Sequence, residues 1–95
     1  MDTKIIEDLV NIVRDRKANP SEKSYTTKLF NGGTNTQIKK LGEENAELIQ
    51  ALLVQDDIDV ASEAADYLYH LIVAMESRNV DFEQTLEVLR KRFNK

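Results

Sequence analysis

Residues 60–75 read VASEAADYLYHLIVAM, and this stretch decides the fold. Its only formal charges are Glu63 and Asp66, which lie three residues apart among side chains that are mostly apolar. A helical segment that is apolar nearly all round is buried on most sides, either by its own chain or by a partner. We therefore predict a central helix from about Asp57 to Arg78.

Three further helices are expected around the central one. Apolar residues recur at helical spacing over about residues 3–17 and again over about residues 36–54. A last helix is expected to begin at Asp81, where Gln84 completes a capping-box pattern. Between the first two lies a stretch with the only proline and two of the three glycines, so we interpret it as a long ordered loop with one helical turn near Thr27. The predicted fold class is all-α, a bundle of four to five helices.

The length and composition favour a small protein that associates with itself. A chain of 95 residues makes one domain, residues 1–95, with limited capacity to bury its own surface. Because the chain has no cysteine, disulfides and zinc–thiolate sites cannot reinforce it, and a homodimer or higher homo-oligomer is the expected way to gain buried area.

The same composition limits the expected location and partners. Absence of cysteine fits a cytoplasmic protein, and the charged N-terminal residues do not resemble a signal peptide. No apolar stretch is long enough to span a membrane, so no membrane partner is expected. The net charge of −4 argues against nucleic acid as a partner.

Four carboxylates form two pairs at helical spacing. Glu44 and Glu47 lie three residues apart on the helix expected over residues 36–54, and Glu63 and Asp66 are spaced in the same way on the central helix. Each pair projects from one helix face. If the two helices pack antiparallel, the pairs meet and can enclose a cation, for which all-oxygen ligation favours Mg²⁺, with Mn²⁺ also suitable. Since Mg²⁺ often takes substrate phosphates as further ligands, the pattern indicates a phosphate-bearing substrate.

Two structural explanations compete with a metal site. One is that Glu63 and Asp66 form ion pairs with lysines elsewhere in the chain, such as Lys39 or Lys40. The other is that both acids lie on a narrow solvent-exposed stripe together with Asp59 and His70. On spacing alone, these explanations and the metal site are about equally supported.

The other polar residues of the central helix are interpreted as structural. His70, the only histidine, is expected to be buried and hydrogen-bonded to Asp66 or to a backbone carbonyl, rather than catalytic. Tyr67 and Tyr69 are expected to be core or interface aromatics rather than groups that stack on a nucleotide.

Several motifs resemble those of a known family over about residues 9–93. They are RK at 16–17 followed by Pro20, SYT at 24–26, KLGEE at 40–44, EAAD at 63–66 and LYH at 68–70. In this combination the chain resembles the phosphoribosyl-ATP pyrophosphohydrolases of histidine biosynthesis, a branch of the MazG-like nucleoside triphosphate pyrophosphohydrolases.

The resemblance implies a MazG-like bundle completed by dimerisation, and Mg²⁺-dependent hydrolysis of phosphoribosyl-ATP to phosphoribosyl-AMP and pyrophosphate, the second step of the pathway. The metal ligands that it implies are Glu44, Glu47, Glu63 and Asp66. The catalytic residues that it implies are Glu43, Glu44 and Lys40, with Glu43 orienting a ligand or accepting a proton and Lys40 contacting phosphate. The residues implied to hold phosphates or phosphoribosyl groups are Arg16, Lys17, Ser24, Tyr25, Thr26, Lys28 and Lys40.

The chain departs from the family pattern at two positions that bear on substrate preference. Asn45 replaces the usual alanine after the paired glutamates and is expected to need a hydrogen-bond partner if it is buried. Gln37 replaces a basic residue in a segment that is one residue longer than usual. Two other functions stay open: hydrolysis of non-standard nucleoside triphosphates, and a non-catalytic helical dimerisation module.

Overall fold

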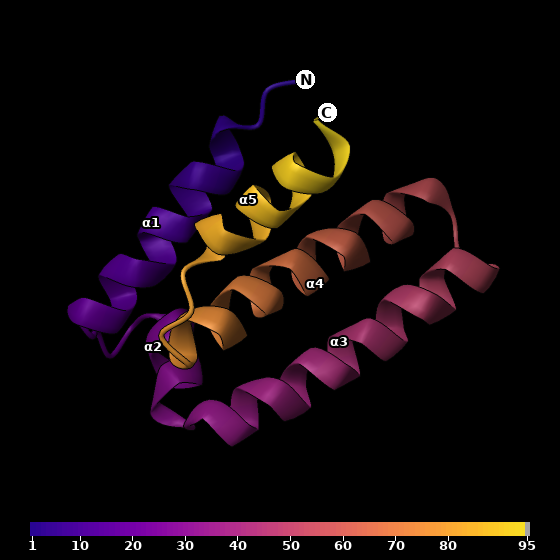
Figure 1. The fold of residues 1–95 in the computed structure, drawn as a ribbon. Helices are drawn as coiled ribbons and strands as arrows, with labels where there is room; N and C mark the ends of the chain where they lie inside the picture. Colours follow the sequence, from indigo (N-terminus) through magenta and orange to yellow (C-terminus); the bar gives the residue numbers. More distant parts are fainter. Residues whose placement is uncertain (95) are drawn as a thin grey trace.

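The computed structural model describes residues 1–94, which form five helices and no strand (Figure 1). The helices are α1 (Lys4–Ala18), α2 (Tyr25–Asn31), α3 (Thr34–Val54), α4 (Asp57–Ser77) and α5 (Phe82–Phe93). The predicted all-α class is confirmed, and the central helix has almost the expected bounds.

The longest two helices, α3 and α4, form an antiparallel hairpin (Figure 1). At its closed end, the side chain of Asp56 accepts a hydrogen bond of 3.0 Å from the backbone N–H of Asp59 and so caps α4. At its open end, the hydroxyls of Thr34 and Ser77 lie 2.9 Å apart. The hairpin therefore has one register, and this register brings the two acidic segments alongside each other.

The segment before α3 is more helical than predicted. A single turn was expected near Thr27, but residues 25–31 form a complete short helix whose N-terminus is capped by Ser24, which accepts from the backbone N–H of Thr27 at 3.2 Å. Gly33 has a φ of 85°, a left-handed conformation that glycine adopts readily, and this bend lets α3 begin at Thr34 instead of Thr36. The cap at Ser24 thus stabilises a helix over residues 25–31, although turn-forming residues are frequent in this segment.

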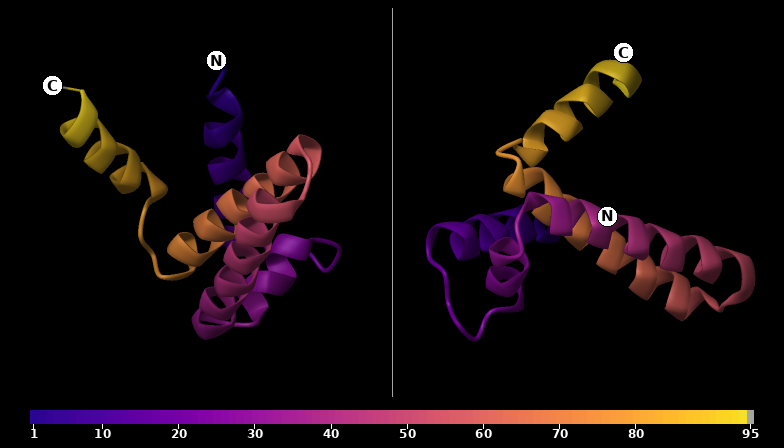
Figure 2. Two further views of the ribbon diagram at one scale, coloured as in Figure 1. Left: turned by 90° about the vertical axis from the view of Figure 1, so that its right-hand side faces the viewer. Right: turned by 90° about the horizontal axis from the view of Figure 1, so that it is seen from below.

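The hydrophobic core lies at one end of α4. Its buried members come from α1, α2, the C-terminal half of α4 and the start of α5, and they are Val10, Val13, Leu29, Ile72, Val73 and Phe82. From there α5 diverges from the other helices (Figure 2), so that Phe93 near its end is 80% exposed. The expectation that α4 is buried on most sides holds within this chain for its C-terminal half only.

A partly buried ion pair joins α1 to the end of α4. Arg14 Nε donates to Glu76 Oε1 at 3.1 Å, and the same guanidinium donates to Glu83 on α5. The contact with Arg14 lowers the pKa of Glu83 to about 2. The predicted capping box at Asp81 is wrong: its side chain makes no cap hydrogen bond and instead lies 3.7 Å from Arg14. The side chain of Asp81 therefore lies toward the ion pairs of Arg14 and does not cap α5.

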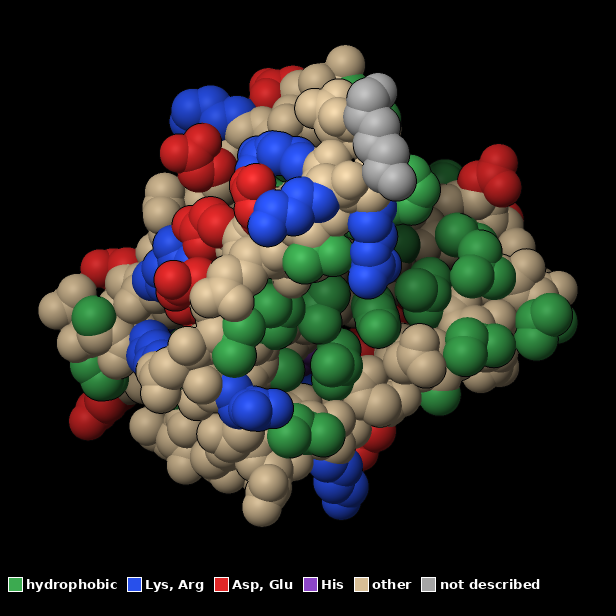
Figure 3. Space-filling model, in the orientation of Figure 1, with side chains coloured by type: hydrophobic (Ala, Val, Ile, Leu, Met, Phe, Trp, Pro, Cys, Tyr) green, Lys and Arg blue, Asp and Glu red, His purple; other side chains and the backbone are tan. Residues whose placement is uncertain are grey.

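The far half of the hairpin leaves much apolar surface uncovered by the chain itself. Figure 3 shows hydrophobic side chains gathered over the hairpin. Large hydrophobic residues that are exposed around its closed end are Ile49, Leu52, Leu53, Val54 and Ile58, and Ile38 is exposed near the start of α3. Patches of this kind on a small domain mark association surfaces. Within residues 1–94, no helix combines the length and hydropathy needed to cross a membrane.

Candidate functional site

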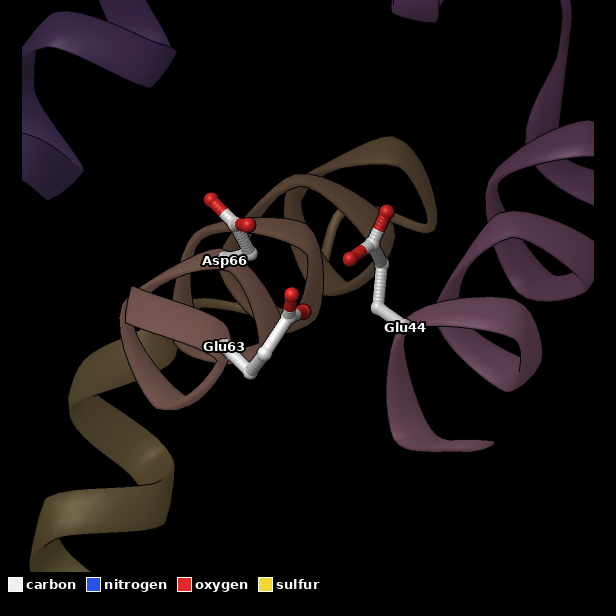
Figure 4. Close-up of side chains that lie close together, drawn as sticks. All are labelled: Glu44, Glu63 and Asp66. Carbon is white, nitrogen blue, oxygen red and sulfur yellow. The ribbon is translucent and has the colours of Figure 1, made fainter. Parts of the chain in front are cut away.

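Three of the four paired carboxylates converge between the helices of the hairpin. Glu44 on α3 faces Glu63 and Asp66 on α4 (Figure 4), and one oxygen of each lies within 4.8 Å of the others. The i, i+3 spacing places both acids of α4 toward α3. The antiparallel register then brings Glu44 opposite them.

The carboxylates are poorly compensated by the protein. Glu44 is only 7% exposed, and the buried Oε2 atoms of Glu44 and Glu63 have no hydrogen-bond partner among the described residues. Burial, followed by the charge of Glu47, raises the pKa of Glu44. Burial also raises the pKa of Glu63, with the charges of Glu47 and Asp66 adding to the effect. Unpaired carboxylate oxygens that face one another are the donor set that a hard divalent cation requires, so these residues fit such an ion.

Glu47 lies at the rim of this cluster. It is exposed and is not one of the three side chains that share the 4.8 Å limit. Its carboxylate nevertheless lies close enough to interact with both Glu44 and Glu63 and to raise the pKa of each. Its role as a fourth ligand stays a prediction.

A lysine stands next to the cluster on α3. Lys40 Nζ is 3.7 Å from Glu44 Oε1 and 3.9 Å from Glu43 Oε2. Within residues 1–94, no lysine or arginine forms an ion pair with Glu63 or Asp66. The structural explanation in which lysines neutralise the acids of α4 is therefore not supported, because Lys40 faces Glu44 instead.

His70 is buried, as expected, but among the described residues it forms neither of its expected hydrogen bonds, to Asp66 or to a backbone carbonyl. It is 5% exposed, and its Nε2 faces Glu44 Oε1 at 3.6 Å, with no hydrogen bond to Asp66. Burial is the largest cause that lowers the pKa of His70, and this shift favours the neutral form of the ring. The expected solvent-exposed stripe therefore does not include His70, although Asp66 is exposed and Glu63 is half-buried.

The residues implied to hold the substrate fall into two groups. Three are engaged inside the chain: Lys17 donates to the backbone carbonyl of Glu76, Ser24 caps α2, and the hydroxyl of Thr26 lies 2.5 Å from that of Tyr69. The others are wholly or partly exposed, and they are Arg16, Tyr25, Lys28 and Lys40. Of the exposed group, Lys40 contacts the carboxylates directly and Tyr25 contacts His70.

The two positions that depart from the family pattern behave differently. Asn45 is exposed, so it needs no buried partner. Gln37 is almost fully buried, and its Nε2 donates to the backbone carbonyl of Leu29. Gln37 thus ties the end of α2 to the start of α3. The helical spacing of Gln37 did not reveal this role, because the contact depends on the turn at Gly33.

Comparison with known proteins agrees with the motifs. The family described as phosphoribosyl-ATP pyrophosphohydrolase matches residues 6–93. The chain is 40% identical over 90 residues to the phosphoribosyl-ATP pyrophosphatase of Lactiplantibacillus plantarum, covering 95% of this chain and 85% of that protein. It is 40% identical over 91 residues to the enzyme of that name from Clostridium novyi, covering 96% and 83%.

Bifunctional relatives are similar over a shorter part of their length. Identity with the histidine biosynthesis bifunctional protein of Nostoc sp. is 40% over 87 residues, which is 92% of this chain and 40% of the relative. The chain therefore spans about 40% of the length of such relatives. The family resemblance expected from the sequence motifs is confirmed.

Proposed function

The chain belongs to the phosphoribosyl-ATP pyrophosphohydrolase family, and from this membership we propose that it hydrolyses the α–β phosphoanhydride of phosphoribosyl-ATP. The products are phosphoribosyl-AMP and pyrophosphate, and the reaction is the second step of histidine biosynthesis. One observation carries the proposal: three carboxylates within 4.8 Å of one another, with buried oxygens that lack a partner.

The proposed cofactor is Mg²⁺, with Mn²⁺ able to replace it. Glu44, Glu63 and Asp66 would hold the ion, and Glu47 at the rim would complete the set. Such an ion, when bound, supplies Lewis acidity toward phosphate oxygens and lowers the pKa of a water molecule. The all-carboxylate donor set supports this assignment, because oxygen ligands favour hard cations.

The neighbouring residues of α3 would position the reacting groups. Lys40 Nζ, 3.7 Å from Glu44 Oε1, would bind a phosphate oxygen and so offset negative charge that develops during the reaction. A water oxygen attacks the α-phosphorus while the bond from that phosphorus to the bridging oxygen breaks, and pyrophosphate departs. The carboxylate of Glu43, beside Lys40 and open to solvent, would accept the proton released by the water.

The exposed residues before and on α2 would bind the remaining parts of the substrate. Arg16 and Lys28 carry positive charge that suits phosphate groups. Lys17, Ser24 and Thr26 are engaged within the chain, so their contribution would be to hold this region in place.

A homodimer in the cytoplasm is the proposed working form. The exposed apolar residues of the hairpin support a second copy as the partner, because leaving them in water is unfavourable. Isologous packing of two hairpins would cover the same patch on both copies.

The direct test is release of pyrophosphate from phosphoribosyl-ATP and from a panel of nucleoside triphosphates, with and without Mg²⁺. We expect Mg²⁺-dependent turnover with preference for phosphoribosyl-ATP, and its loss in the Glu63→Gln variant. Glu87→Gln on α5, far along the chain from the cluster, is the matched control and should behave as wild type. Preference for simple triphosphates would instead favour a hydrolase of non-standard nucleotides, and unchanged turnover in Glu63→Gln would contradict the proposed metal ligands.

A further inference from the structure

Three aromatic rings form a cluster between α2 and α4. The ring of Tyr25 lies 6.4 Å from that of Tyr69, at an interplanar angle of 29°, and 6.4 Å from that of His70, edge to face. The rings of Tyr69 and His70 are 5.0 Å apart. Separations and angles of this kind are favourable for aromatic groups, so the three rings support one another.

The inner part of the cluster is held firmly and adjoins the carboxylates. The hydroxyl of Tyr69 is fixed by Thr26 at 2.5 Å, and His70 is buried with its Nε2 3.6 Å from Glu44 Oε1. The outer ring differs, because Tyr25 is 53% exposed. The cluster thus presents one open aromatic ring, backed by two fixed ones, next to the candidate metal centre.

We propose that Tyr25 forms a stacking subsite for the purine base of the substrate, with Tyr69 and His70 holding its ring in place. The inference rests on the proposed function and assigns a ligand group to Tyr25 that differs from the phosphates or phosphoribosyl groups expected at first. Bases stack on aromatic side chains through their π-faces, and this interaction contributes substantially to nucleotide binding.

The surroundings of Tyr25 suit a base better than a phosphate. A phosphate subsite offers cationic groups or N–H donors, and Lys40 meets that need beside Glu44. Tyr25 has two aromatic rings as neighbours, those of Tyr69 and His70. In a nucleotide, one ribose separates the α-phosphate from the base, and in the protein one buried imidazole separates Glu44 from Tyr25. In the proposed arrangement, the α-phosphate lies at the carboxylates and the base lies at Tyr25, with His70 between the two subsites.

Steady-state kinetics of two variants test the subsite. Tyr25→Leu keeps an apolar side chain but has no π-face, and we expect its KM for phosphoribosyl-ATP to rise by roughly 10-fold, with kcat affected much less. Tyr25→Phe retains the ring and should recover most of the wild-type KM. An unchanged KM in Tyr25→Leu would overturn the proposal, as would a Tyr25→Phe variant as impaired as Tyr25→Leu.

A binding measurement covers the case in which Tyr25→Leu folds poorly. The chain contains no tryptophan, so Tyr25→Trp introduces a single fluorophore that also retains an aromatic face. We expect AMP to quench its fluorescence and ribose 5-phosphate, which has no base, to leave it unchanged. Phe93→Trp, at an exposed position on α5, is the control that AMP should not quench. Equal responses of the two variants to AMP would contradict the subsite.

The two proposals can fail separately. If wild type releases no pyrophosphate from phosphoribosyl-ATP while AMP still quenches Tyr25→Trp, the proposed function is wrong and the base subsite stands. If wild type turns over phosphoribosyl-ATP while Tyr25→Leu keeps its KM and Tyr25→Trp shows no quenching, the function stands and the subsite is wrong.

Discussion

Replacing Glu44 by glutamine removes one negative charge from the carboxylate cluster and nearly preserves the shape of the side chain. The three carboxylates each have an oxygen within 4.8 Å of the others, and two unit charges at this limit repel by roughly 3 kcal/mol at an effective dielectric constant of about 20. Because Asp66 is exposed and solvent screens its charge, we expect relief of about 1–2 kcal/mol. Lys40 loses a partner but keeps access to water, which limits the opposing effect.

The metal-free Glu44→Gln variant should therefore be more stable than metal-free wild type. For a domain of this size the gain corresponds to a rise in Tm of about 5–10 °C. Addition of Mg²⁺ should reverse the order. Wild type gains about 2.7 kcal/mol when free Mg²⁺ reaches 100 times its Kd, whereas a variant that binds the ion poorly gains little.

Thermal unfolding in EDTA and across a Mg²⁺ titration measures both effects, at one protein concentration because association also shifts Tm. Glu87→Gln, which removes a charge from the surface of α5, is the control and should follow wild type throughout. A Glu44→Gln variant that is less stable than wild type without metal, and equally stabilised by Mg²⁺, would refute the reasoning. It would mean that Lys40 and His70 already compensate the carboxylate.

Three further predictions concern the scaffold. Arg14→Met should lower the free energy of unfolding by about 3–5 kcal/mol, because it leaves the buried carboxylate of Glu76 without its partner. Urea denaturation measures this loss, and adding Glu76→Gln to Arg14→Met should recover part of it. Glu83→Gln should destabilise the fold by no more than about 1 kcal/mol, since the pair with Arg14 is largely exposed. The pKa of Glu83 is lowered from 4.5 to about 2, so the stability from this pair is fully present above pH 4.5 and is lost as the pH falls toward 2. The difference in free energy of unfolding between wild type and Glu83→Gln should therefore vanish across this range. A constant difference would contradict the ion pair. Leu52→Glu should weaken self-association in sedimentation velocity, because it places a charge in the exposed apolar patch of α3, while Val88→Glu on α5 should not.

Helical periodicity predicted the fold class and the long helices because their apolar residues repeat over many turns. The same approach missed α2, whose seven residues are too few for a periodic pattern and lie among turn formers. It also assigned Asp81 to a capping box, although Arg14 attracts this side chain. Each error arises where a contact between distant segments competes with a local preference.

The candidate site shows the same division between local and long-range information. Spacing on one helix was sufficient to pair Glu63 with Asp66, and the antiparallel arrangement then brought Glu44 to them. The contact between Glu44 and His70 could not be predicted from spacing, since it depends on how α3 and α4 are rotated about their own axes relative to each other. Nor could the position of Tyr25 against His70, which depends on how α2 is tied to α3 by Gln37.

The position of the carboxylates within the hairpin links the site to assembly. The C-terminal half of α4 contributes Ile72 and Val73 to the core, whereas Glu63 and Asp66 lie in its other half, and nearby Ile58 is 77% exposed. The like charges of the cluster oppose the packing of α3 against α4, and the large apolar residues Leu52, Leu53, Val54 and Ile58 at this end of the hairpin are exposed, so support from outside the chain would stabilise it. Burial of the apolar patch against a second copy would supply that support. Leu52→Glu should therefore reduce the stabilisation by Mg²⁺ along with self-association, although Leu52 is not itself a proposed ligand. A variant that dissociates yet keeps its full response to Mg²⁺ would show that one chain holds the site by itself.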